Sequence, residues 1–234
     1  MMKEAVILAG GFGTRLKSVL SDLPKPMAPV NNRPFLEYIL DYLIRSGINK
    51  FVLSVGHMHE AVTSHFGNSY KNIPIVYAIE EQALGTGGGI RFALSFTETE
   101  NVLVLNGDTL FPVDLNVLLD KHMLMQSSFT LAAKKMEDVS RYGTVKIENN
   151  RISGFEEKKN RCEQGLINGG VYYIQRDFFT KTNMPEKFSL EKDCLEQFFK
   201  TEMICGLAFD DFFLDIGIPE DYEKAASAFE RLGF

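Results

Sequence analysis

Short apolar runs alternate with helical patterns along the first half of the chain. Four runs are almost wholly apolar and rich in β-branched residues: Ala5–Ala9, Phe51–Val55, Ile75–Ile79 and Val102–Leu105. Strands that are covered on both faces of a sheet show such runs. Helical patterns lie between or after them at Pro34–Ser46, Gly87–Ser95 and Leu115–Met125. This alternation predicts an α/β fold with a mainly parallel sheet, flanked by helices and joined by right-handed crossovers.

The pattern changes after about residue 127. Shorter strand-like runs follow one another: Phe129–Ala133, Thr144–Ile147, Val171–Ile174 and Ile204–Ala208. Polar turns such as 148–151 separate these runs, and Glu220–Leu232 has the pattern of an amphipathic helix. We therefore expect a mixed continuation of the same sheet. Because no Pro/Ser/Gly linker divides the halves, the sequence predicts a single Rossmann-like domain over residues 1–234.

The charge and cysteine content exclude several classes of protein. The chain has 25 Lys+Arg against 31 Asp+Glu, which gives a net charge of −6 and disfavours binding along a nucleic-acid backbone. No apolar run approaches the roughly 18 residues that span a membrane. The three cysteines, Cys162, Cys194 and Cys205, are odd in number and form no CxxC pair. They predict reduced thiols and a cytoplasmic location.

A glycine-rich loop follows the first predicted strand in the segment Leu8–Leu16, which reads LAGGFGTRL. Three glycines after a buried strand let backbone N–H groups approach a phosphate, and the following helix N-terminus adds a favourable dipole. The loop lacks the GxxxxGK[ST] pattern, and Leu16 stands where a dinucleotide loop has its third glycine. A stiff Pro24-Lys25-Pro26 segment follows it. These features predict a phosphate-binding site.

The two motifs together resemble the sugar-1-phosphate nucleotidyltransferase (NDP-sugar pyrophosphorylase) family. Four further blocks resemble the family in the same order along the chain: Asn106–Asp108, Phe155–Lys158, Leu166–Tyr172 and Asp215–Tyr222. The sequence departs from the family pattern at Lys159, where proline is usual, and at Ile218, where threonine is usual. The resemblance implies the nucleotide-diphospho-sugar transferase fold, without the C-terminal β-helix of many relatives. It also implies a nucleotide-binding lobe over about 1–126 and a sugar-phosphate-binding lobe over about 127–234.

The resemblance also implies roles for individual residues. The catalytic residues would be Arg15, Lys25, Asp108, Lys158 and Asp215. The nucleotide would be bound by Leu8, Ala9, Gly10, Gly11, Gly13, Thr14, Arg15, Lys25, Glu81, Gln82, Gly85, Thr86, Asn106 and Gly107. The sugar phosphate would be bound by Tyr142, Gly143, Glu157, Lys158 and Asn168. Asp108 and Asp215 follow strands and would hold one hard cation, for which Mg²⁺ is expected.

The second glycine-rich stretch, Leu84–Gly89, reads LGTGGG and bears on the base of the nucleotide. It resembles the base-binding loop of guanylyltransferases more than that of thymidylyltransferases, although some uridylyltransferases carry a similar run. The sequence therefore predicts transfer from an NTP, with GTP favoured, to a sugar 1-phosphate. Among short family members the pattern most resembles enzymes that act on a manno-heptose 1-phosphate for surface polysaccharide synthesis. The alternatives are a mannose-1-phosphate guanylyltransferase, an N-acetylmuramic acid 1-phosphate uridylyltransferase, and a non-catalytic sugar-nucleotide-binding subunit.

A cluster of phenylalanines lies in the second half of the chain: Phe178, Phe179, Phe198, Phe199, Phe209, Phe212 and Phe213. We expect these side chains in the core or in a contact of a homo-oligomer rather than on a base-stacking surface.

Overall fold

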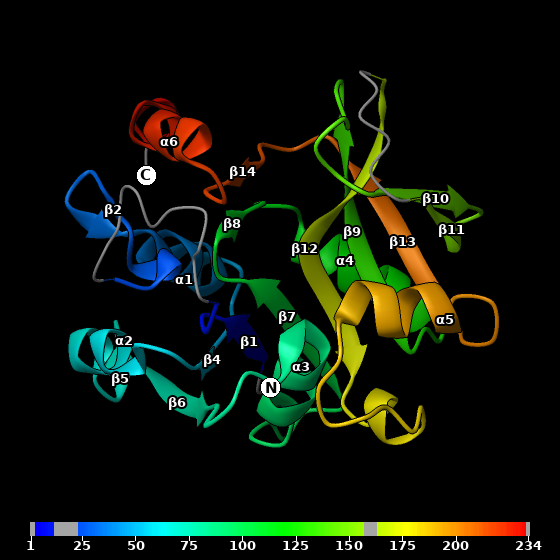
Figure 1. Cartoon of the computed structure of the whole chain (residues 1–234), viewed down its shortest axis with the longest axis horizontal. Helices are drawn as coiled ribbons and strands as arrows, with labels where there is room; N and C mark the ends of the chain where they lie inside the picture. The colour runs from blue at the N-terminus through cyan, green and yellow to red at the C-terminus, as the bar shows by residue number, and fades with distance from the viewer. Residues whose placement is uncertain (1–2, 12–22, 157–162, 233–234) are drawn as a thin grey trace.

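A ten-stranded sheet forms the centre of the computed structural model, which describes residues 3–11, 23–156 and 163–232. Its strands are β1 (Glu4–Leu8), β4 (Lys50–Val55), β5 (Ser69–Tyr70), β6 (Ile73–Ile79), β7 (Asn101–Asn106), β9 (Phe129–Met136), β10 (Thr144–Glu148), β11 (Arg151–Glu156), β12 (Gly165–Gln175) and β13 (Ile204–Phe209). They lie in the order β10-β11-β13-β9-β12-β7-β1-β4-β6-β5 (Figure 1).

Two short ribbons and the helices complete the fold. The ribbons pair β2 (Pro29–Val30) with β3 (Arg33–Pro34), and β8 (Thr109–Leu110) with β14 (Leu214–Asp215). The α-helices are α1 (Phe35–Arg45), α2 (His59–Phe66), α3 (Gly85–Leu94), α4 (Leu115–Leu124), α5 (Glu196–Phe198) and α6 (Pro219–Leu232). Two 3₁₀ turns, η2 (Lys25–Met27) and η3 (Phe178–Thr180), and a π-helix, η4 (Leu190–Leu195), lie between them.

The directions of the strands confirm the predicted fold. β1 is parallel to both β4 and β7, and β6 is parallel to β4. β12 is antiparallel to β7 and to β9, so it reverses the direction between the two parallel groups. Beyond it, β13 is parallel to β9, and β11 and β10 follow in antiparallel pairing. The sheet is therefore mixed, with a mainly parallel first half as the alternating pattern predicts.

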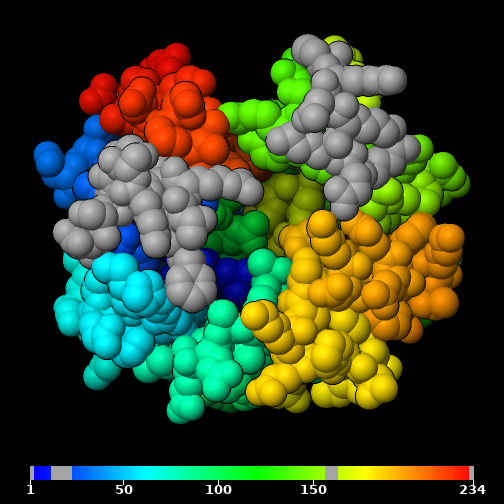
Figure 2. Space-filling view, viewed as in Figure 1, coloured from blue at the N-terminus to red at the C-terminus, as the bar shows by residue number. Residues whose placement is uncertain are grey.

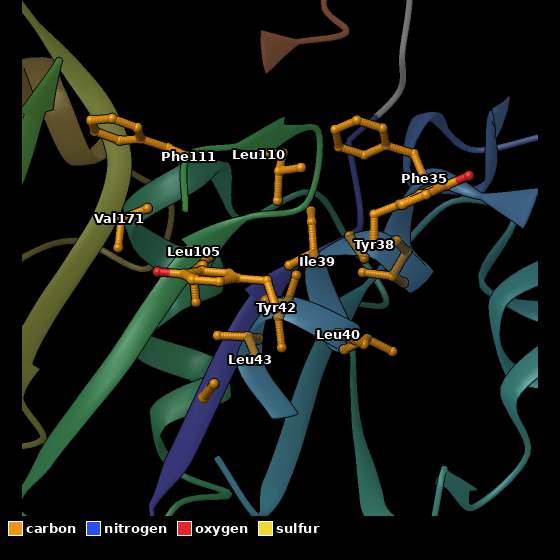
Figure 3. Packing of buried hydrophobic residues seen from close by; sticks show 14 of the residues in the cluster. Phe35, Tyr38, Ile39, Leu40, Tyr42, Leu43, Leu105, Leu110, Phe111 and Val171 are labelled. Carbon is orange, nitrogen blue, oxygen red and sulfur yellow. The ribbon is translucent and has the colours of Figure 1, made fainter. Parts of the chain in front are cut away.

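Helices cover both faces of the sheet, which explains the continuous apolar runs. Ala5 and Ile7 of β1 belong to the core cluster beneath α1, whereas Val6 belongs to the cluster beneath α3. The same alternation holds in β7 and β12 because successive side chains of a strand point to opposite faces. Figure 3 shows how the first cluster packs. It labels Phe35, Tyr38, Ile39, Leu40, Tyr42, Leu43, Leu105, Leu110, Phe111 and Val171.

Several elements differ from the sequence expectation, and two of them bear on the site. β12 begins at Gly165, well before the expected Val171, because its polar and glycine-rich first half still pairs with β9 across an irregularity between Asn168 and Val171. The π-helix η4 was not indicated by any apolar pattern, and it packs against α3. Both elements contribute residues to the site described below. No helix within the described ranges is long and apolar enough to cross a membrane.

Candidate functional site

Three strand ends come together at one edge of the sheet. Leu8 and Asn106 are register partners at the carboxyl ends of the parallel strands β1 and β7. β12 runs in the opposite direction, so Asn168 in its first half reaches the same edge. Ligands of open α/β sheets bind at such carboxyl ends. Figure 2 shows the molecule hollowed near its centre, with dark-blue, green and olive atoms on the floor of the hollow.

A first cavity of about 310 Å³ opens beside the ends of β1 and β7. Its lining residues are Leu8, Gly10, Gly11, Lys25, Pro26, Ser54, Glu80, Ala83, Gly85, Thr86, Asn106 and Asp108. Seven of the residues predicted to bind a nucleotide are among them. Gly10 lies against Val55 and Gly56, and a Cβ at Gly10 would stand 2.9 Å from the backbone nitrogen of Gly56. The glycine is thus needed for the close approach of the two loops.

Other residues predicted to bind a nucleotide lie outside this lining. Ala9 and Gly107 are buried behind it, where the Gly107 N–H donates to the carbonyl oxygen of Leu8 at 2.9 Å. Glu81 and Gln82 are exposed, and neither lines the cavity. The remaining predicted residues of this set lie outside the described residues: Gly13, Thr14 and Arg15.

Glu80 holds a carboxylate in a fixed orientation at this cavity. One oxygen, Oε1, accepts a hydrogen bond from the Ser54 hydroxyl at 2.9 Å, and Oε2 accepts from the backbone N–H of Leu84 at 3.1 Å. These bonds occupy two of the roughly four acceptor positions of a carboxylate. A ligand in the cavity can therefore donate two further hydrogen bonds to Glu80. Among the described lining residues, the other carboxylate is Asp108.

The ribbon of β8 and β14 brings Asp108 and Asp215 together from distant parts of the sequence. Asp215 pairs in register with Thr109, and the Ile216 N–H donates to the Asp108 carbonyl oxygen at 3.0 Å. The Lys25 ammonium donates to Asp108 Oδ2 at 2.9 Å. Asp215 Oδ1 accepts from the Gly217 N–H at 2.7 Å. Two carboxylates and one ammonium thus border the same corner of the site.

The electrostatics of this corner suit a divalent cation. Burial and the neighbouring charge of Asp108 together raise the pKa of Asp215 to about 6, although Lys25 opposes the rise. A cation between the carboxylates would relieve both effects. Within the described ranges no group of three or more His, Cys, Asp or Glu side chains is arranged to hold a metal. Carboxylate oxygens are ligands suited to a hard cation, which can take its remaining ligands from water and substrate.

A second cavity, of about 340 Å³, lies on the other side of Asn106. Its lining residues are Asn106, Arg141, Tyr142, Gly143, Thr144, Val145, Phe155, Ile167, Asn168, Glu191, Lys192 and Glu196. Tyr142, Gly143 and Asn168, which were predicted to bind a sugar phosphate, are thus brought together here. Asn168 donates to the Tyr172 hydroxyl at 2.8 Å and accepts from the Gly170 N–H at 3.1 Å. The predicted partners Glu157 and Lys158 lie outside the described residues.

Several polar lining residues were missed by the sequence analysis. Glu80 immediately precedes the two predicted residues Glu81 and Gln82, and it follows the strand β6 directly. A search for polar residues at strand ends could have found it. Arg141 precedes the predicted Tyr142–Gly143 pair, and its guanidinium donates to Asp221 Oδ2 at 2.6 Å. The acids Glu191 of η4 and Glu196 of α5 carry no signal in the sequence, because their positions depend on the packing of η4 against α3 and of α5 against η4.

Comparisons with known proteins agree with this geometry. The sequence model of the nucleotidyl transferase family matches residues 4–231. The chain is 49% identical to a D-glycero-alpha-D-manno-heptose 1-phosphate guanylyltransferase from Aneurinibacillus thermoaerophilus, over 95% of this chain and 96% of that protein. It is 46% identical to a protein of the same name from Campylobacter jejuni, over 94% of this chain and 96% of the other.

A solved structure is similar over almost the whole fold. The crystal structure of HddC from Yersinia pseudotuberculosis complexed with GMP-PN superimposes with a TM-score of 0.86 at 35% sequence identity. The match covers 97% of this chain and 100% of that chain. The chain therefore shares the fold of that structure, including the edge of the sheet at which both cavities lie.

Proposed function

Because the chain belongs to the nucleotidyl transferase family, we propose that it transfers a guanylyl group from GTP to D-glycero-α-D-manno-heptose 1-phosphate and releases pyrophosphate. One observation carries the proposal: two cavities meet at Asn106, beside the carboxylates of Asp108 and Asp215. A nucleotide in the first cavity and a sugar 1-phosphate in the second would bring their phosphates together at that corner. The similarity to two heptose 1-phosphate guanylyltransferases supports the choice of substrates.

The reaction requires little covalent work from the protein. An oxygen of the sugar phosphate attacks the α-phosphorus of GTP, the bond to the β-phosphate oxygen breaks, and pyrophosphate leaves with that electron pair. The phosphate monoester is already an anion near neutral pH, so a general base is not needed. The barrier comes from the mutual repulsion of two anions, and the site acts by positioning and by compensating charge.

The described residues supply part of that compensation. Lys25 lines the first cavity, where its ammonium donates to Asp108. We propose that it neutralises the α-phosphate region. Arg15 and Lys158 are proposed, on the sequence resemblance alone, to contact the pyrophosphate portion of GTP and the sugar phosphate. The glycines of the first cavity allow backbone N–H groups to approach the phosphates closely.

Nucleotidyl transferases generally use a divalent metal, and we propose Mg²⁺ here, held by Asp108 and Asp215. The raised pKa of Asp215 supports this assignment, because a buried carboxylate beside Asp108 would be stabilised in its charged form by a nearby cation. When bound, Mg²⁺ would neutralise phosphate charge and fix the geometry of in-line attack. Lys25, whose ammonium contacts Asp108, would share the neutralisation of the phosphate charge with the metal.

Glu80 supports guanine as the base. Guanine presents two adjacent donors, N1–H and the 2-amino group, whereas uracil and thymine present one donor between two carbonyl groups. Adenine and cytosine place an acceptor beside their amino group. A carboxylate with two remaining acceptor positions therefore matches guanine alone. The hydrogen bonds from Ser54 and Leu84 hold Glu80 in place, so this match requires no rearrangement of its carboxylate.

We place the reaction in the cytoplasm, where nucleoside triphosphates are available. We also assign its product, GDP-heptose, to the synthesis of surface polysaccharide. The thiols of Cys194 and Cys205 are free and buried, which is compatible with a reducing compartment.

The proposed function is tested by identifying the products. Purified protein is incubated with GTP, the heptose 1-phosphate and Mg²⁺, and the mixture is analysed for pyrophosphate and, by mass spectrometry, for GDP-heptose. We expect both products in equal amounts, and neither when the sugar phosphate is omitted. GTP hydrolysis without a sugar nucleotide, or the absence of turnover, would contradict the proposal.

A further inference from the structure

A hydrogen bond joins the two cavities across their common wall. Thr86 lines the first cavity and lies in the first turn of α3. Glu191 lines the second cavity and lies in the first turn of the π-helix η4. The Thr86 hydroxyl donates to Glu191 Oε2 at 3.2 Å, although the two residues are 105 positions apart. A side chain that lines the first cavity is therefore hydrogen-bonded directly to a side chain that lines the second.

The surrounding contacts tie Thr86 and Glu191 into one connected unit. The Thr86 hydroxyl oxygen also accepts from the Leu190 N–H at 2.9 Å, and the Ser189 hydroxyl donates to Glu191 Oε2 at 3.2 Å. The Gly87 N–H donates to the Phe188 carbonyl oxygen at 3.1 Å. A Cβ at Gly87 would lie 2.2 Å from the Phe188 ring. Gly87 of the LGTGGG run is therefore required for the close packing of the segment at Phe188 against α3.

The polarity of the second cavity indicates which part of a sugar phosphate faces Glu191. The phosphate must lie near Asn106, because there the cavity adjoins the nucleotide site. The acidic side chains Glu191 and Glu196 line the same cavity, and each would repel a phosphate dianion placed beside it. Sugar hydroxyls, in contrast, donate readily to carboxylates. The bonds from Thr86 and Ser189 leave Glu191 about two of its roughly four acceptor positions.

We propose that Glu191 is a positioning residue that binds a hydroxyl of the sugar and couples the sugar site to the nucleotide site through Thr86. This inference rests on the proposed function, since it requires a sugar 1-phosphate in the second cavity. Nucleotide contacts that fix Thr86 also fix Glu191, so the sugar phosphate then binds with a smaller loss of conformational entropy. The coupling is reciprocal by thermodynamic linkage. Each substrate binds more tightly when the other is present.

The coupling is measured by calorimetric titration of the heptose 1-phosphate, with and without a GTP analogue that carries a methylene group between the α- and β-phosphorus atoms. The ratio of the two Kd values is the coupling factor. We expect about tenfold in the wild type, the scale of one hydrogen bond to a charged group. Glu191→Ala should weaken sugar-phosphate binding about tenfold and bring the coupling factor close to one.

Further variants separate this role from a merely structural one. Thr86→Ser retains the hydroxyl and should keep the coupling factor, whereas Thr86→Ala should lower it as Glu191→Ala does. Glu191→Gln preserves the size of the side chain and removes its charge, and it should also lower the factor if Glu191→Ala does not fold. Glu196→Gln is the matched control, because Glu196 lines the same cavity and α5 follows η4 directly. It should leave the coupling factor unchanged.

The outcomes distinguish this inference from the proposed function. A wild-type protein that releases no pyrophosphate from GTP and the heptose 1-phosphate overturns both. A wild-type protein that is active but has a coupling factor of one overturns the inference alone. The inference also fails if Glu191→Ala and Glu191→Gln retain the wild-type coupling factor, or if Glu196→Gln loses it to the same extent.

Discussion

Asp215→Asn should stabilise the metal-free protein while it abolishes nucleotidyl transfer. Burial and the charge of Asp108 raise the pKa of Asp215 to about 6, from an ordinary value of 3.8. The native state therefore binds the proton more tightly than the unfolded chain does. Ionising Asp215 costs native stability progressively above about pH 4, and the full cost is reached above about pH 6. Each pKa unit corresponds to about 1.4 kcal/mol, which makes the full cost about 3 kcal/mol.

Asparagine removes this cost with little change of shape. Its side-chain oxygen can still accept the hydrogen bond that the Gly217 N–H gives to Asp215 Oδ1. We expect the free energy of unfolding to rise by about 2 to 3 kcal/mol at pH 7, and by about half as much at pH 5, where Asp215 is largely protonated in the native wild type. Turnover should fall by at least about a hundredfold because the cation loses one carboxylate ligand.

The assay is urea unfolding followed by circular dichroism, with a chelator present, for both proteins at both pH values. Asp120→Asn serves as the control, because Asp120 is exposed on α4 and its replacement should leave stability unchanged. A destabilised Asp215→Asn protein would refute the reasoning. So would a gain of stability that is as large at pH 5 as at pH 7, since it would have another origin than the raised pKa.

Three further predictions test other parts of the structure. Glu80→Gln should remove the preference for GTP over ITP, which lacks the 2-amino group. The wild type should favour GTP by about tenfold or more in kcat/KM. If the ratio of kcat/KM for GTP to that for ITP is the same in both proteins, Glu80 does not recognise the base. Burial lowers the pKa of His122 to about 4, so protonation of His122 should cost the native state up to about 3 kcal/mol as pH falls from 7 to 4, and in urea titrations the free energy of unfolding of His122→Gln should rise relative to that of the wild type by about this amount over that range. Removal of divalent metal with a chelator should abolish pyrophosphate release, and added Mg²⁺ should restore it. Asp108→Asn should remain inactive in Mg²⁺ although its circular dichroism spectrum is unchanged. Activity of this variant within tenfold of the wild type would contradict the metal assignment.

Local patterns were sufficient to predict the α/β class of the sheet and the helices α1, α3, α4 and α6. The run Ala5–Ala9 is apolar throughout because Ala5 and Ile7 enter one core cluster and Val6 enters the other. The Glu148–Arg151 turn also follows from local chemistry. Asn149 and Asn150 adopt positive φ angles, 51° and 61°, which asparagine tolerates better than most residues. These features depend on neighbours in the sequence, so the sequence alone carries them.

The rest of the site depends on contacts between distant segments. Glu191 enters the sugar cavity because η4 docks on the glycines of α3, which lie about a hundred residues earlier in the chain. No periodic pattern marks such a π-helix, and no spacing rule links it to Thr86. Glu80 was missed for another reason. A resemblance of loops directed attention to Glu81 and Gln82, whereas the strand end places the preceding side chain at the cavity.

The most direct test of the account measures pyrophosphate release from GTP, UTP, ATP and CTP, each combined with the 1-phosphates of D-glycero-α-D-manno-heptose, mannose, glucose and N-acetylmuramic acid. The account predicts the highest kcat/KM for GTP with the heptose 1-phosphate, because Glu80 matches the guanine edge and the chain is similar to heptose 1-phosphate guanylyltransferases. Highest turnover with UTP would contradict the assignment of guanine. Highest turnover with GTP and mannose 1-phosphate would retain guanine and contradict the heptose.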